Sequence, residues 1–161
     1  MPRIIASHLS SEYVSEVVYG TVIGLALVVA LEAHPPAAIA TAVTIVTTAV
    51  AVGLAELYSE LVGARVRPRS DGEEPAALAP EVAAVVAGAA FPSLFFFLAA
   101  AGVLKLDTAF TIAKWSGLGL IAAYGFWAAR LGGAPHHKAL LQAGGVALIG
   151  AFVIAVKALV H

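Results

Sequence analysis

The sequence predicts an all-α, polytopic membrane protein: a bundle of five transmembrane helices with its N-terminus in the cytoplasm. Composition is the first indication, because 61% of the 161 residues are hydrophobic and only 12% are charged. Soluble domains are about 45–50% apolar and about 25% charged. A core of this size cannot bury so much apolar surface, so the surrounding solvent must be lipid. The composition excludes a disordered chain, a nucleic-acid binder and a typical cytosolic enzyme.

Long apolar runs are the second indication. A helix needs roughly 20 mostly apolar residues to cross about 30 Å of hydrocarbon. Five stretches meet this requirement, and they lie at about 13–31, 37–62, 82–104, 108–129 and 139–160. Runs of this length favour helices, because barrel strands alternate in polarity over about ten residues. We therefore expect residues 1–161 to form a single transmembrane domain.

Polar or proline-rich breaks between the runs are the third indication. His34-Pro35-Pro36 separates the first two stretches, and the polar segment 64–81 separates the second from the third. Shorter breaks at 105–108 and 131–138 bound the fourth stretch. The first stretch is expected to remain as a span, because its apolar run is too long and its flank too acidic for a signal peptide.

Lysine and arginine predict the orientation. In a five-span chain, the N-terminus and the second and fourth loops share a side, and that side holds Arg3, Arg65, Arg67, Arg69, Arg130 and Lys138. The opposite side holds Lys105 and, near span ends, Lys114 and Lys157. The positive-inside rule then places the N-terminus in the cytoplasm and the C-terminus outside. The expected location is the inner (plasma) membrane of a prokaryote.

Acidic residues inside the spans are the candidate site. Glu12 and Glu16 lie four apart in the first stretch, and Glu56 and Glu60 lie four apart in the second. An ionisable group at the membrane centre costs about 2.5–3.5 kcal/mol on insertion scales, so such residues usually have a partner or a function. Because the two helices are antiparallel, the four carboxylates are expected at the same cytoplasmic-side depth. We interpret them as a metal or proton site.

Simpler interpretations exist for individual acids. Glu12 can favour the dipole of a first helical turn, and Glu60 is close enough to a span end to be solvated. Glu16 and Glu56 lie deeper. Like charges held together repel, so the cluster needs protons or cations to neutralise it.

Small residues share the faces of these acids. Gly20 and Gly24 form a GxxxG motif on the Glu16 face, and Ala49 and Gly53 continue the Glu56 face. Small residues at this spacing let two helix backbones approach closely. We expect the first and second helices to pack together through these faces. We also expect a two-fold homodimer built from the first and second helices of each copy, because Gly20 and Gly24 permit the close approach.

Two charges are expected at the opposite, outer side. Lys114 lies inside the fourth stretch, and Glu32 ends the first, so the two can form a charge pair. Alternatively, the lysine extends to the membrane interface. The chain has no cysteine and no nucleophile motif, phosphate loop or nucleotide fingerprint. It is therefore predicted to be no enzyme and to hold no permanent cofactor.

The second stretch resembles a known family. The segment 42–67, with Ala55-Glu56-Leu57-Tyr58-Ser59, is similar to the end of the second helix in the vacuolar iron transporter family, where a Gly-Glu-Tyr-x-Ser motif precedes basic residues. Tyr19-Gly20-Thr21-Val22 resembles the Asp-Gly-x-Val of that family's first helix. Phe91-Pro92-Ser93-Leu94 is similar to its Gly-x-x-Pro-x-x-Pro segment.

The resemblance implies a homodimer that exports Fe²⁺ or Mn²⁺ from the cytoplasm in exchange for protons. Glu56 matches the second-helix glutamate of the family, while Tyr19 stands where the family has aspartate. Glu16, one turn away, could substitute for that aspartate, and Tyr58 lies near the same site.

Two features depart from the family. Its long glutamate-rich segment is reduced here to a short loop with Asp71, Glu73 and Glu74, and Met1 is the sole methionine. Oxygen ligands alone suit Mg²⁺, Ca²⁺ or Mn²⁺ better than a soft metal.

Two other functions remain open from the residues. One is a small oligomeric ion channel, gated by a hydrophobic plug such as Phe95-Phe96-Phe97. The other is a non-transporting membrane subunit whose charges are assembly contacts. The position of the acids discriminates these functions: a transporter places them in a cleft between helices, and a channel places them around an axis.

Overall fold

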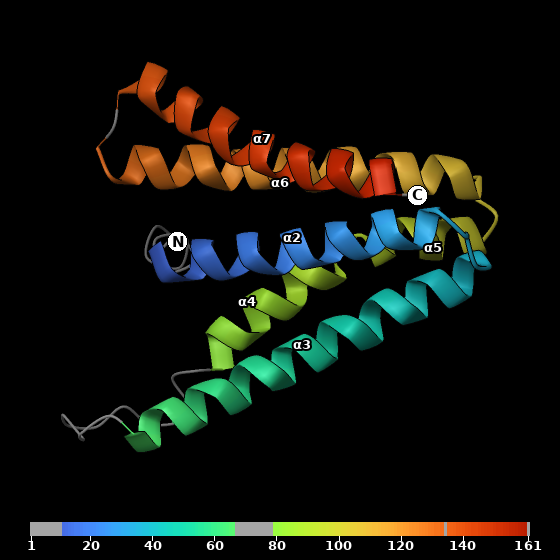
Figure 1. Ribbon diagram of the computed structural model, residues 1–161, viewed down its shortest axis with the longest axis horizontal. Helices are drawn as coiled ribbons and strands as arrows, with labels where there is room; N and C mark the ends of the chain where they lie inside the picture. Colours follow the sequence, from blue (N-terminus) through green and yellow to red (C-terminus); the bar gives the residue numbers. More distant parts are fainter. Residues whose placement is uncertain (1–10, 67–78, 134, 161) are drawn as a thin grey trace.

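The computed structural model is all-helical and describes residues 11–66, 79–133 and 135–160. Within these residues it has six helices: α2 (Ser11–Glu32), α3 (Ala38–Val66), α4 (Ala79–Ala90), α5 (Ser93–Ala100), α6 (Leu106–Leu131) and α7 (His136–Val160). The helices run back and forth along the long axis of the molecule (Figure 1). Every apolar stretch identified in the sequence is helical, and the third is divided between α4 and α5.

Two helices are long and apolar enough to cross a membrane, namely Tyr13–Glu32 and Ala38–Gly63, each with a mean hydropathy of 2.1. The bent pair of α4 and α5 makes a third if it is counted as one span. Among the described residues, α6 is less apolar than these helices and is not one of the candidate spans. The structure thus indicates an integral, multi-pass membrane protein with two to three candidate spans. The five-span arrangement stays a prediction.

Pro92 explains the break in the third stretch. It lacks the N–H that would bond to the carbonyl of Gly88, and its ring crowds that same turn. The chain bends by 47° between α4 and α5. The turn is closed by short-range bonds instead, from the N–H of Leu94 to the carbonyl of Phe91 and from the N–H of Phe95 to the carbonyl of Pro92.

Glycine ends α5 in a Schellman motif. Gly102 has a φ of +77°, which side chains with a Cβ rarely adopt. Its N–H bonds to the carbonyl of Ala99, and the N–H of Val103 bonds to the carbonyl of Leu98. These two bonds satisfy carbonyls that the helix end leaves free. The chain then reverses and begins α6 within a few residues.

The closest helix packing joins α2 to α4. A Cβ on Gly20 would overlap the carbonyl oxygen of Val85, and a Cβ on Gly24 would lie 2.5 Å from that of Ala89. From the side of α4, a Cβ on Gly88 would overlap the carbonyl oxygen of Val17 on α2. The two backbones therefore touch, as small residues permit.

This contact corrects the expectation that the glycine face of the first helix packs against the second. α2 and α3 have few contacts with each other, while α4 packs extensively against both. In Figure 1, α2 and α3 diverge from their connecting loop, and α4 lies between them. The physical reason is the composition of α4, whose alanines and Gly88 leave its backbone open to close approach. The contact between α2 and α4 also corrects the expected dimer contact, because α4 already covers Gly20 and Gly24.

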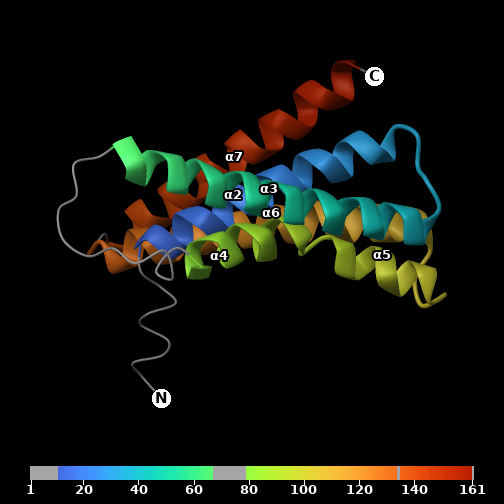
Figure 2. The same ribbon diagram turned by 90° about the horizontal axis from the view of Figure 1, so that it is seen from below.

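A hydrophobic core lies toward the other end of the bundle, where α2, α3, α5 and α6 meet. Its fully buried members are Val28, Ala42, Ile45, Phe96, Ala109, Phe110 and Ala113. The rings of Phe96 and Phe110 meet edge to face with their centroids 4.7 Å apart. Aromatic pairs favour this geometry. α7 packs mainly on α6, and Figure 2 shows its C-terminal half leading away from the other helices.

The helix directions agree with the expectation that the start of the first helix and the second and fourth breaks lie on the same side. The start of α2, the end of α3, the start of α4 and the junction of α6 with α7 all lie at the left end in Figure 1. The helix ends that border the N-terminal segment and the second and fourth loops therefore share one end of the bundle. Of the basic residues that predict the orientation, Arg3, Arg67 and Arg69 lie outside the described residues.

Placing valine at Gly24 should destabilise the protein by about 1–3 kcal/mol, because the added side chain must push α4 away. Thermal unfolding in detergent, followed by circular dichroism, measures the effect. Gly119→Val is the matched control, because a Cβ there meets nothing within 4 Å. Equal stability of the two variants would contradict the packing of α2 against α4.

Candidate functional site

Four glutamates from three helices gather at the end of the bundle where α2 begins. They are Glu16 on α2, Glu56 and Glu60 on α3, and Glu81 on α4, and all four are half-buried. Glu16 interacts electrostatically with Glu56, Glu81 and Glu60. The sequence expectation that the acids of the first two helices approach one another at one depth is in keeping with this arrangement. The side chain of Glu12 lies outside the described residues.

The glycine faces explain why these acids approach. Glu16 lies one turn before Gly20 on the face of α2 that touches α4. Glu56 lies one turn after Gly53, where an added Cβ would overlap the side chain of Val86 on α4. Both acidic helices therefore turn these faces toward α4, which carries the fourth acid. The cluster is a consequence of the α4 packing and not of direct contact between α2 and α3.

Glu81 is the acid that sequence reasoning missed. In the sequence, Pro80-Glu81 is typical of a helix start, where an acid favours the helix dipole. Glu81 also precedes Val85 by four residues and Gly88 by seven, and both of these residues are buried against α2. That spacing places Glu81 on the α2-facing side of α4, and it is the signal that could have identified the residue.

The acids of the cluster that the structure describes do not form a direct metal site within one chain. Across the residues that the structure describes, no three His, Asp or Glu side chains are close enough together to hold one metal ion. Within the same residues, none of the four carboxylates forms a hydrogen bond or an ion pair. Binding of a metal by Glu12, Glu16, Glu56 and Glu60 remains a prediction. Dispersed carboxylates can hold protons or a cation that keeps part of its water shell.

No protein-family model matches the chain, and no curated protein or solved structure matches it either.

The two tyrosines expected near the site are exposed. Tyr19 is 49% exposed and Tyr58 is 71% exposed, and neither is packed into the interior between the helices. Among the described side chains of α2, Glu16 is the acid that belongs to the cluster.

The structure contains the charge pair expected between Glu32 and Lys114. The Nζ of Lys114 on α6 donates to both carboxylate oxygens of Glu32, the last residue of α2, at 2.7 Å each. Both side chains are partly buried, which strengthens the interaction relative to an exposed pair. One end of α2 therefore holds a paired acid, and the other end holds the glutamate cluster.

The phenylalanines proposed as a channel plug do not share one surface. Phe96 is fully buried in the core of the chain itself, against Phe110, while Phe97 is 42% exposed. Phe95 packs partly against the same core. Because Phe96 serves the core, a plug made of all three side chains does not fit this structure.

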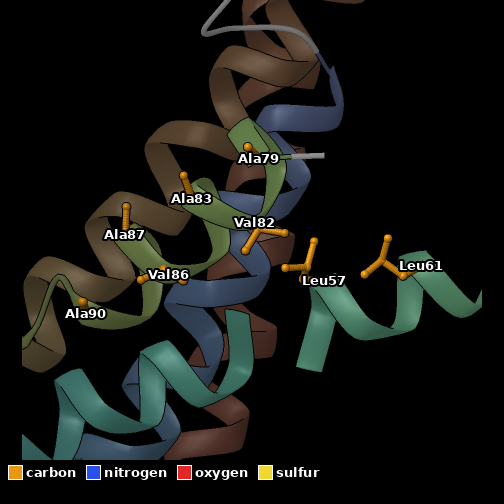
Figure 3. Close-up of a pocket in the computed structure, with 8 residues that line it drawn as sticks. All are labelled: Leu57, Leu61, Ala79, Val82, Ala83, Val86, Ala87 and Ala90. Atoms are coloured by element: carbon orange, nitrogen blue, oxygen red, sulfur yellow. The ribbon is translucent and has the colours of Figure 1, made fainter. Parts of the chain in front are cut away.

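An apolar groove lies between α3 and α4. Its volume is about 780 Å³, and Figure 3 shows the side chains that line it: Leu57, Leu61, Ala79, Val82, Ala83, Val86, Ala87 and Ala90. The lining contains no carboxylate. The groove therefore offers no ligand to a cation and is distinct from the glutamate cluster.

Neutralising Glu81 should weaken cation binding to about the same degree as neutralising Glu16. The physical reason is that each removes one negative charge from the same cluster. Titration of Mn²⁺ into Glu81→Gln and Glu16→Gln, in detergent and followed by calorimetry, measures the affinity. Asp107→Asn is the control, because this exposed acid lies at the start of α6, away from the cluster. Unchanged affinity in Glu81→Gln would exclude Glu81 from the site.

Proposed function

We propose that this protein is an integral membrane cation transporter, which moves a divalent metal of the Fe²⁺ or Mn²⁺ kind in exchange for protons. The observation that carries the proposal is the glutamate cluster: four half-buried acids from three helices at one end of an apolar bundle. Acids in such a position are costly to insert and usually mark an ion or proton pathway.

The cluster can couple the movement of a cation to the movement of protons. Carboxylates that repel one another are stabilised either by protons or by a cation, and the two compete for the same oxygens. Binding of the cation therefore releases protons, and cation binding weakens as the pH falls. Alternating the access of such a site between two sides of a membrane gives exchange of one ion for the other.

The direction of transport and the choice of metal form the finer part of the proposal. Export from the cytoplasm, with Fe²⁺ or Mn²⁺ as the substrate, follows from the resemblance to the vacuolar iron transporter family. A site made of carboxylates favours Mn²⁺ over softer metals. Five spans in a prokaryotic plasma membrane, with the cluster at the cytoplasmic end, complete this arrangement.

A homodimer is part of the proposal. One chain does not bring three ligands together among its described residues, and a two-fold partner would add a second set of the same acids. The glycine surface of α2 is occupied by α4. The two copies must therefore meet through a different surface from the one that the GxxxG motif predicts.

Replacing Glu56 with Gln should lower the initial rate of Mn²⁺ uptake at least tenfold, because it removes one negative charge from the cluster while keeping the shape of the side chain. Uptake into proteoliposomes, with and without a pH gradient, measures this rate. Asp107→Asn should transport at the wild-type rate. A matching wild-type rate in Glu56→Gln would remove the site assignment.

Wild-type protein that carries no cation under any gradient would overturn the transporter proposal in favour of a non-transporting subunit. Uptake that is fast but independent of a pH gradient would instead favour a channel. The proton exchange is supported only if an opposing pH gradient accelerates Mn²⁺ movement.

A further inference from the structure

α6 combines features that do not fit an independent membrane span. It is 26 residues long and carries Asp107 and Arg130 in its first and last turns and Lys114 in its interior. It is absent from the described helices that are apolar enough to cross a membrane on their own. An unpaired lysine inside a span strongly disfavours insertion.

The packing nevertheless places α6 inside the bundle. Ala109, Phe110, Ala113 and Ile121 are all fully buried, and α6 contacts α2, α5 and α7. Figure 1 shows α6 running alongside α2 over most of its length. Trp115 and Trp127 are exposed on the outer surface of α6.

Glu32 explains how a helix with a lysine in its interior can lie inside the bundle. It accepts two hydrogen bonds from Lys114 although the residues lie 82 positions apart in the chain. The pair neutralises the one cation in the interior of α6. It also places a positive charge beside the last turn of α2, which has no basic residue of its own. One turn from each partner, Val28 and Phe110 are fully buried in the core.

We propose that α6 is a conditional span, which crosses the membrane stably only when Glu32 of the already inserted α2 pairs with Lys114. α2 is apolar enough to insert without help, and its last residue then offers a carboxylate at the depth where Lys114 must lie. The pair therefore positions α6 in the membrane and aligns it lengthwise with α2. This inference is independent of the transport proposal, because it concerns the end of α2 opposite to the glutamate cluster.

Cysteine labelling tests the proposal, because the native chain contains no cysteine. Val103→Cys reports the side where α6 begins, and His137→Cys reports the side where it ends; both positions are exposed. The protein is synthesised in a cell-free system with liposomes, and an impermeant thiol reagent is applied. In the otherwise wild-type chain, the two positions should be labelled from opposite sides.

Glu32→Gln keeps the shape of the side chain and removes its charge. It should raise severalfold the fraction of chains in which both positions are labelled from one side. Adding Lys114→Leu to this variant should restore opposite-side labelling, because the unpaired cation is gone. The exchanged pair, Glu32→Lys with Lys114→Glu, should restore it as well. Rescue by these second changes separates lost pairing from general misfolding.

Asp107→Asn is the matched control. Asp107 lies two turns before Lys114 on the same helix, so its loss removes an equal charge from the same region without breaking the pair. Its labelling should equal that of the wild type. Wild-type labelling in Glu32→Gln would overturn the proposal, because Lys114 would then be stabilised at the interface without its partner. Failure of Lys114→Leu to rescue Glu32→Gln would also overturn it.

Discussion

The backbone contact between α2 and α4 determines how the rest of the bundle is arranged. Gly20 and Gly24 on one side and Gly88 on the other leave no room for a Cβ, so the two helices approach more closely than ordinary side chains allow. α4 must then lie beside α2, and α3, which follows α2 in the chain, packs on the outer side of α4. The position of every glutamate in the cluster follows from this order of helices.

Much of this could be predicted from the sequence, and the failures have a common physical cause. The helices coincide with the apolar runs, because run length and the proline and glycine breaks are local signals. The pairing of Glu32 with Lys114 was also predictable, since opposite charges inside apolar helices need partners.

The helix that packs on the glycine face of α2 was not predictable in this way. GxxxG shows that some helix approaches closely, but it does not say which one, and Gly88 lies in a stretch interrupted by Pro92. Glu81 was overlooked because a helix start and a site contribution look alike in sequence.

The acids at the two ends of α2 have different neighbours. At Glu32 the carboxylate has a cation at hydrogen-bond distance, so the charge is neutralised within the protein. At Glu16 the described neighbours are other acids. A protein that needed both ends only for assembly would be expected to pair both. The difference between them supports our two proposals, ion binding at the Glu16 end and assembly at the Glu32 end.

Because α4 lies between α2 and α3, its thickness determines how far apart the carboxylates of these two helices lie. Packed helices lie about 8–10 Å apart, so an acid on α2 and an acid on α3 that both face α4 are held farther apart than two ligands of one bare ion. This spacing accounts for the lack of a three-ligand group among the described residues, and Glu81 on α4 partly fills the interval. The cation that we propose for this place would keep water between itself and some of the carboxylates. Such a site would bind more weakly than a closed cage, and weak binding suits a transporter that must release its ion on the other side.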